Sequence, residues 1–262
     1  MQNKYQGIRF IFTITAGRSG TKLLAQLLKS TLKIDATHEP APRLNYVFRS
    51  FVRSPEAARN WLEAEKLPAI LNGLQGKLYV ETSHLFCKGF IEPAFEIGLR
   101  PDFIILHRPA REIAKSMYQL NVIPERTSTG RLVLLGPSDP GVLHLPNWLR
   151  YSDYQLCYWY ALEIERRQNY YEKTLPEKYG TRVFRLNLTE LTNWAFFQQL
   201  SQFILGSQPA ILDKEVYDQV LSINQNPKIS LMGKSQERSL PPDIESEEME
   251  LIDVLQKKPS FS

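Results

Sequence analysis

Apolar residues follow two different periods along the chain, and the change from one to the other predicts strands separated by helices. Five short segments rich in β-branched and aromatic residues indicate strands, and they cover residues 8–15, 34–37, 77–80, 103–107 and 182–186. A helical period is clearest after residue 21, where one face carries Leu23, Leu24, Leu27, Leu28 and Leu32. Further helices are expected over residues 44–74, 111–120, 151–175 and 193–205.

Strands that alternate with helices are typical of an α/β protein with a parallel sheet. We therefore expect a three-layer α/β/α fold with a central parallel sheet, formed by one domain over residues 1–234, because no linker interrupts the alternation. Ligands of such sheets bind at the carboxyl ends of the strands. Three segments fall there, namely the turn at residues 17–20 and the residue pairs 38–39 and 107–108.

Composition places the chain among ordinary globular proteins. Of its 262 residues, 43% are hydrophobic and 23% are charged, close to average values. No apolar run approaches the roughly 18–20 residues of a membrane span, and the first residues lack the apolar core of a signal peptide. Two cysteines, Cys87 and Cys157, fit neither a disulfide framework nor a zinc cluster. They are expected to be reduced core thiols of a cytoplasmic protein.

Charge is spread unevenly along the chain. The net charge is +4, but residues 235–262 hold three basic and seven acidic side chains, so residues 1–234 carry +8. A moderately basic body suits an anionic small molecule. No run of five to eight Lys and Arg residues occurs, so a nucleic-acid surface is not predicted.

The turn after the first strand has the composition of a phosphate-binding loop. Its sequence, GRSGT at residues 17–21, leads into a helix, whose positive end and exposed N–H groups attract anions. Arg18 supplies a cation, while Ser19 and Thr21 supply hydroxyl donors.

This turn is not a Walker A loop, which needs a lysine directly after its last glycine. Here Thr21 follows Gly20, and the GKS sequence at residues 233–235 has Lys228 where the first glycine should stand. A nucleotide or small-molecule kinase would share the fold and is the alternative interpretation, which the missing Walker lysine disfavours. A non-catalytic nucleotide-binding protein on the same fold is the other alternative.

A second element lies at the end of the strand over residues 103–107. Arg108 follows that strand, and Ser116 comes eight residues later on the next helix, so that both can face one anion. With this element the sequence resembles the sulfotransferase family, which uses 3′-phosphoadenosine 5′-phosphosulfate. Residues 15–21 look like the family's 5′-phosphosulfate loop, and the segment VFRLNLTEL at residues 183–191 is similar to its segment near the nucleotide base.

The resemblance implies a P-loop nucleoside triphosphate hydrolase-like sulfotransferase fold, a donor site and a reaction. The 5′-phosphosulfate would contact Arg18, Ser19, Gly20, Thr21 and Lys22, and the 3′-phosphate would contact Arg108 and Ser116. Lys228 and Lys234 lie where many members complete the 3′-phosphate site. The product would be adenosine 3′,5′-bisphosphate, with no metal required. The acceptor would be a hydroxyl, or an amine, of a small molecule, a glycan or a lipid-linked group.

Sulfuryl transfer needs a base for the acceptor proton and a cation for the leaving phosphate. Arg18 is the expected cation. Glu39 is the first candidate for the base, because carbohydrate- and tyrosylprotein-type members carry a catalytic glutamate in that region. His84 and His38 are the other candidates, and no metal-ligand spacing joins them.

Two stretches have no clear period. Residues 121–150 contain four prolines and three glycines, and long aperiodic segments are often functional or mobile. We expect them to form a lid over the acceptor cleft, with an apolar covering surface made of Leu132, Val133, Leu134 and Leu135. Residues 235–262 are acidic and interrupted by proline, and are expected to form a flexible or surface-lying tail.

Overall fold

The computed structural model describes residues 5, 7–206, 212–223 and 238–257. The chain forms two compact units, of which the first comprises residues 1–108 and 167–228, and the second residues 109–166 and 229–262. The alternation of strands and helices does not reveal this division. Residues 109–166 contain helices and turns but no strand, so the sequence shows no second set of strands that would mark a separate unit.

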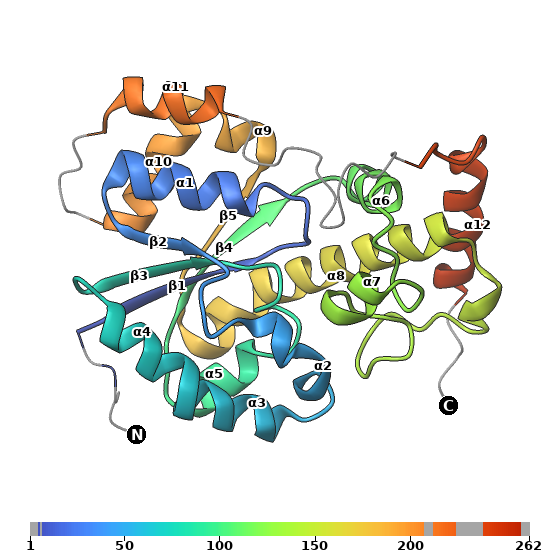
Figure 1. Ribbon diagram of the computed structural model, residues 1–262, viewed down its shortest axis with the longest axis horizontal. Helices are drawn as coiled ribbons and strands as arrows, with labels where there is room; N and C mark the ends of the chain where they lie inside the picture. The colour runs from blue at the N-terminus through green and yellow to red at the C-terminus, as the bar shows by residue number, and fades with distance from the viewer. Residues whose placement is uncertain (1–4, 6, 207–211, 224–237, 258–262) are drawn as a thin grey trace. The chain divides into compact units, whose positions relative to one another are not determined.

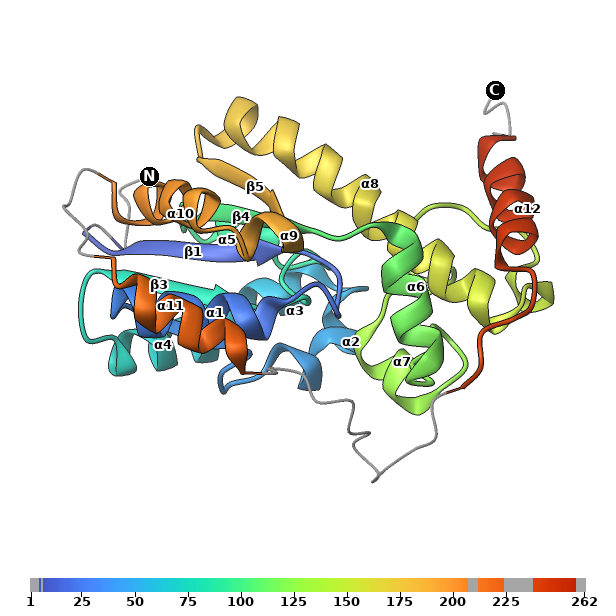
Figure 2. The same ribbon diagram turned by 90° about the horizontal axis from the view of Figure 1, so that it is seen from above.

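Five parallel strands form the sheet of the first unit, in the order β2-β3-β1-β4-β5. They are β1 (Arg9–Ile14), β2 (Asp35–His38), β3 (Leu78–Thr82), β4 (Asp102–His107) and β5 (Val183–Asn187). Figure 2 shows β5, β4, β1 and β3 side by side in this order. The predicted parallel sheet is thus confirmed, and each strand lies within two residues of its expected position.

Helices cover both faces of this sheet, which confirms the predicted three-layer α/β/α fold. One face carries α1 (Thr21–Leu32), α10 (Trp194–Leu205) and α11 (Lys214–Ser222), and the other carries α3 (Pro55–Trp61), α4 (Leu67–Gly73) and α5 (Ile91–Glu96) (Figure 1). Shorter elements of the unit are η1 (Leu44–Tyr46), α2 (Phe48–Phe51), the π-helical turn η2 (Leu62–Lys66) and α9 (Leu188–Leu191).

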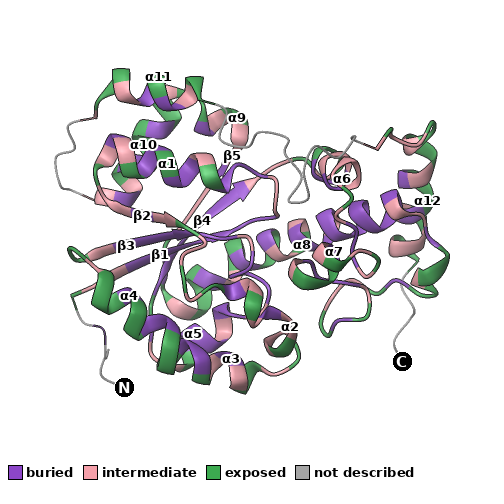
Figure 3. Cartoon of the chain, viewed as in Figure 1, coloured by how far each residue is buried: buried purple, intermediate pink, exposed green. Residues whose placement is uncertain are grey.

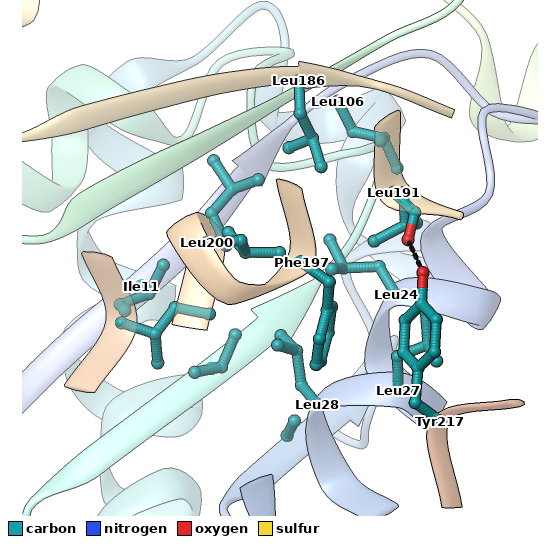
Figure 4. Packing of buried hydrophobic residues seen from close by; sticks show 14 of the residues in the cluster. Ile11, Leu24, Leu27, Leu28, Leu106, Leu186, Leu191, Phe197, Leu200 and Tyr217 are labelled. Atoms are coloured by element: carbon teal, nitrogen blue, oxygen red, sulfur yellow. Dashed lines mark hydrogen bonds between the residues drawn. The ribbon is translucent and has the colours of Figure 1, made fainter. Parts of the chain in front are cut away.

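The two faces of the sheet are packed with different side chains. Toward α1, α10 and α11 the core is aliphatic, and it also contains Tyr217, whose hydroxyl donates to the Leu191 carbonyl at 3.0 Å (Figure 4). Toward α5 the core is aromatic, with Phe12 stacked on Phe86 at a centroid distance of 3.9 Å. Because both faces are covered, the central strands are buried along most of their length (Figure 3).

The described residues of the second unit, 109–166 and 238–257, form helices and turns. Its helices are α6 (Ala110–Gln119), α7 (Ser128–Val133), the 3₁₀ turn η3 (Trp148–Arg150), α12 (Ile244–Gln256) and the first part of α8 (Asp153–Tyr179), whose residues from Arg167 onward belong to the first unit. Within the described residues, no helix combines the length and the apolar character needed to cross a membrane.

Helix α12 is a structured element within the acidic C-terminal segment, which composition alone does not predict. Glu248 on α12 is nearly buried, accepts from the Tyr154 hydroxyl at 2.6 Å and pairs with Arg111 at 2.7 Å. Leu251 is fully buried one turn later. Part of the acidic charge is therefore neutralised within the second unit instead of lying in solvent.

Residues 121–150 contain short regular structure and a small core of their own. Helix α7 is capped by the hydroxyl of Thr127, which accepts from the Gly130 N–H at 3.1 Å. Leu134 and Leu135 are buried within the second unit, whereas Leu132 is 42% exposed. The four-residue apolar covering surface expected here is therefore wrong for Leu134 and Leu135, because their side chains fill the core of the unit. The proposed lid function itself stays a prediction.

Candidate active site

The chain turns sharply between β1 and α1, and this turn has the shape of an anion-binding loop. The Thr15 hydroxyl donates to the Leu106 carbonyl at 2.7 Å, which ties the start of the turn to β4. Arg18 and Gly20 both have left-handed backbones, with φ of 69° and 93°. Such residues can turn successive N–H groups toward one concavity. Space also requires glycine at position 20, because a Cβ there would lie 2.6 Å from the Leu188 side chain.

Helix α1 presents its uncapped N-terminus at this turn. Gly20 is the N-cap residue, and no side chain caps the helix, so its first N–H groups have no partner within the helix. Ser19 is fully buried, and its Oγ has no hydrogen-bond partner among the described residues. A buried hydroxyl without a partner costs about 1–3 kcal/mol. A bound anion would accept from both the hydroxyl and the N–H groups.

Two arginines add positive charge to the turn. Arg108 directly follows β4, and its Nη1 donates to the carbonyl oxygen of Arg18. Burial, together with the charge of Arg108, lowers the pKa of the Arg18 guanidinium. Thr21 is buried at the start of α1, and Lys22 is exposed beside it. Cations gathered at an open helix end favour a ligand that carries several negative charges.

The structure defines the expected 3′-phosphate ligands Ser116, Lys228 and Lys234 less closely than it defines the turn. Ser116 lies on α6, in the second unit, so its expected convergence with Arg108 on one phosphate stays a prediction. Lys228 and Lys234 lie outside the described residues.

A carboxylate and an imidazole meet beyond the ends of β2 and β3. Glu39 follows β2 with a left-handed backbone, φ 48°, and its Oε1 lies 3.5 Å from Nε2 of His84. The Glu39 side chain keeps 31% of its surface exposed, whereas His84 keeps 13%. Two of the three candidate bases are thus in contact, and Glu39 is the more accessible of them.

His38 is directed differently from Glu39. Its Nδ1 lies 2.9 Å from the Thr82 carbonyl oxygen, and because a carbonyl can only accept, we assign the proton to Nδ1. His38 pairs with Thr82 in the register of β2 and β3. The expectation that one member of the pair 38–39 faces the cleft rested on an extended backbone. Glu39 instead has a left-handed backbone, so the alternation of an extended segment does not apply to this pair.

A hydrogen bond joins the start of α1 to the end of β3, two residues before His84. The Thr82 hydroxyl donates to the Thr21 carbonyl at 2.9 Å, at the first residue of α1. The next residue, Ser83, exchanges hydrogen bonds with Thr13 of β1 at 2.8 and 2.9 Å. The end of β3, from which His84 follows, is thereby fixed to β1 and to the start of α1. Both parts of the candidate site lie at the same edge of the sheet.

A buried lysine lies behind His84 and escaped the sequence analysis. Nζ of Lys88 is 2.8 Å from Nδ1 of His84, and Lys88 is fully buried. Burial lowers the pKa of Lys88 to about 7. Burial and the neighbouring charge of Lys88 also hold the pKa of His84 well below its usual value, so that His84 is a neutral imidazole. The four-residue spacing of His84 and Lys88 was visible in the sequence, but the burial was not.

A second buried lysine supports the chain just after Glu39. Nζ of Lys66, on the turn η2, lies 2.9 Å from Oε2 of Glu81 and donates to the carbonyls of Pro40 and Pro42 at 3.2 and 3.1 Å. The Tyr79 hydroxyl donates to the same Glu81 oxygen at 2.7 Å. Lys66 thus fixes the backbone that leaves Glu39.

Other candidate groups of the sequence have structural surroundings. In the part of the chain that the structure describes, no three His, Cys, Asp or Glu side chains gather as a metal site requires. Cys87 and Cys157 are buried free thiols, as predicted. His107 contacts Gln168 of α8 at 3.2 Å, and Gln168 in turn donates to the Ile14 carbonyl at 3.1 Å.

Comparison by sequence gives no relative of this chain. No family model matches it, and no curated protein matches it either. The fold therefore has to be compared through solved structures.

Solved structures with the same fold include two sulfotransferase domains. One is the sulfotransferase domain from the Synechococcus PCC 7002 olefin synthase, with a TM-score of 0.51 and 13% identity over 96% of this chain and 95% of that one. The other is the sulfotransferase domain from the curacin biosynthetic pathway, with a TM-score of 0.51 and 13% identity over 96% of this chain and 98% of that one. The chain thus shares the fold of sulfotransferase domains along nearly its whole length.

Proposed function

We propose that this chain is a sulfotransferase, which moves the sulfuryl group of 3′-phosphoadenosine 5′-phosphosulfate onto a hydroxyl or an amine of an acceptor. The observation that carries the proposal is the pairing of two features at one sheet edge. One is the anion-binding turn with Arg18. The other is the half-buried carboxylate of Glu39, which contacts His84 just after β3, the strand that the 2.9 Å hydrogen bond between Thr82 and Thr21 ties to the start of α1. The fold shared with sulfotransferase domains agrees with it.

The turn suits the donor's phosphosulfate. The buried Oγ of Ser19 would donate to it, and Gly20 leaves room for the backbone to approach. Arg18 would neutralise its charge, and Arg108 would bind the 3′-phosphate, with Ser116 as the expected second ligand. When bound, the donor supplies an activated sulfuryl group on a phosphate leaving group.

The residues at the sheet edge divide the chemistry between them. Glu39 takes the proton of the acceptor hydroxyl while the acceptor oxygen forms a bond to sulfur. The bond between sulfur and the phosphate oxygen breaks, and the phosphate leaves with the electron pair. Arg18 stabilises the charge that develops on this oxygen. Neutral His84 holds Glu39 in place and does not compete with it as a cation. We propose a small molecule, a glycan or a lipid-linked hydroxyl as the acceptor.

The test is a transfer assay with radiolabelled donor and pooled hydroxyl acceptors. We expect Glu39→Gln, which keeps the shape of the side chain but accepts no proton, to lower turnover by about 10²–10⁴ with donor affinity unchanged. Glu56→Gln is the matched control, because Glu56 on α3 is 77% exposed. Wild-type turnover in Glu39→Gln would contradict the role of Glu39. Thermal stabilisation by ATP with magnesium, and none by adenosine 3′,5′-bisphosphate, would favour a kinase instead.

A further inference from the structure

Lys88 is unusual because a fully buried amine meets an imidazole. Its Nζ lies 2.8 Å from Nδ1 of His84, and the other ring nitrogen of His84, Nε2, lies 3.5 Å from Oε1 of Glu39. Three titratable side chains thus form a continuous line from the interior to the half-exposed carboxylate. Burying a lysine is costly unless its contacts compensate for the lost hydration.

The donor and acceptor capacities of the three side chains decide which ring nitrogen of His84 carries the proton. A protonated lysine can only donate, so Nδ1 of His84 must accept and carry no proton. The ring proton is then on Nε2, which faces a carboxylate oxygen that can only accept. Lys88 thus donates to His84, and the N–H of His84 faces the Glu39 carboxylate, whose Oε1 lies 3.5 Å from Nε2.

We infer that Lys88 is a positioning residue for the general base. It fixes His84 as the Nε2–H tautomer, and this N–H holds the Glu39 carboxylate in the orientation that accepts the acceptor's proton. The inference rests on the proposed function for its catalytic part, whereas the tautomer itself is a property of the protein alone. The logic is that of other catalytic groups that are oriented by a partner and by the partner of that partner.

The surroundings of Lys88 make this role sensitive to pH. Burial is the largest cause that lowers the pKa of Lys88; Cys87 and Glu39 raise this pKa, and Arg49 and Arg167 lower it further. His38 is the other group that acts on His84. A neutral Lys88 amine can accept from Nδ1 as well as donate, so that the tautomer of His84 is no longer fixed. Turnover should therefore fall as pH rises through the pKa of Lys88.

The first test determines the tautomer of His84 and needs no measurement of activity. In protein labelled with ¹⁵N at histidine, and at a pH below the pKa of Lys88, we expect the His84 signals to show a proton on Nε2 and none on Nδ1 in the wild type. The signals of Lys88→Met should show a mixture of both tautomers. Lys29→Met, on an exposed position of α1, is the control and should leave the His84 signals unchanged. A wild-type His84 with its proton on Nδ1 would overturn the inference.

The second test reads catalysis. We expect Lys88→Met to lower kcat by about 10–100-fold, the usual cost of losing an orienting partner, with the KM for the donor unchanged. Lys88→Arg keeps a permanent donor, so it should retain more activity than Lys88→Met and lose the decline of kcat near neutral pH. Should Lys88→Met fail to fold, Lys88→Arg and Lys88→Gln supply the same comparison. Equal pH profiles in the wild type and Lys88→Arg would contradict the inference. Absence of transfer in the wild type would instead contradict the proposed function, while the tautomer result would stand.

Discussion

Lys66 and Lys88 are both buried in the first unit, but Lys66 meets a carboxylate and Lys88 meets an imidazole. Lys66 pairs with Glu81 at 2.9 Å and also donates to two backbone carbonyls. Lys88 donates to His84 at 2.8 Å and has a pKa lowered to about 7 by burial. The first lysine contacts a carboxylate and two backbone carbonyls, and we interpret it as structural. The second titrates near neutral pH, next to the candidate base.

Burial alone therefore does not make a lysine functional. What distinguishes the two positions is the partner, because a carboxylate compensates the desolvation of an ammonium group and a neutral imidazole does so only in part. The comparison predicts that mutation of Lys66 affects stability most, whereas mutation of Lys88 affects catalysis and the pH dependence of stability.

The largest effect on stability is expected for Lys66→Met. It leaves Glu81 as a buried carboxylate without its cation, and breaking a buried ion pair from one side typically costs about 3–5 kcal/mol. Urea denaturation followed by circular dichroism measures this loss. The double variant Lys66→Met/Glu81→Leu should recover part of it, because no charge is then left unpaired. A loss below about 1 kcal/mol in the single variant would show that the pair is not desolvated as the structure has it.

A second prediction concerns Lys88→Met and pH. The pKa of Lys88 is about 7 in the folded state and about 10.4 in an unfolded chain, so between these values the unfolded state binds the extra proton. Wild-type stability therefore rises with pH across this window through Lys88. Lys88→Met lacks this pH-dependent contribution to the free energy of unfolding.

The free energy of unfolding of Lys88→Met, relative to the wild type, should thus fall by about 2 kcal/mol between pH 7 and pH 9. Urea denaturation of both proteins at the two pH values measures it. Lys29→Met, with its exposed position, should show no such change. A constant difference between Lys88→Met and the wild type would mean that the pKa of Lys88 is ordinary.

The smallest effect is expected for Tyr79→Phe. The variant removes the hydroxyl that donates to Glu81 at 2.7 Å but leaves Lys66 in place, so Glu81 stays neutralised. The loss of one hydrogen bond of this kind should cost about 1–2 kcal/mol, measured by the same denaturation. A loss as large as that of Lys66→Met would show that Tyr79, and not Lys66, holds the buried carboxylate.

The sequence predicted the sheet well, because β1, β3 and β4 are short, mostly apolar runs, and strands of this kind alternate with helical segments. The turn with Arg18 was also predictable, since its glycines and the helix that follows are local features. Lys66 and Lys88 were missed because lysines usually lie in solvent, and their burial depends on residues distant in sequence, such as Pro40 and Glu39.

The helices α7 and α12 were also missed, each for its own reason. Helix α7 has six residues, too few for a helical period to be recognised between prolines. Helix α12 is rich in acidic residues, and its buried Glu248 is neutralised by Arg111, more than a hundred positions earlier in the chain. For α12, the acidic composition indicates a segment exposed to solvent, whereas the contact with Arg111 buries one of its carboxylates.

The central claim, a nucleotide donor site at the turn between β1 and α1, is tested most directly by isothermal titration calorimetry with adenosine 3′,5′-bisphosphate and no divalent cation. We expect saturable binding to the wild type and at least about tenfold weaker binding to Arg18→Gln, because a charge-assisted hydrogen bond is lost. Arg59→Gln, on α3, is the control and should bind as the wild type does. No binding to the wild type, or equal binding to the wild type and Arg18→Gln, would contradict the account.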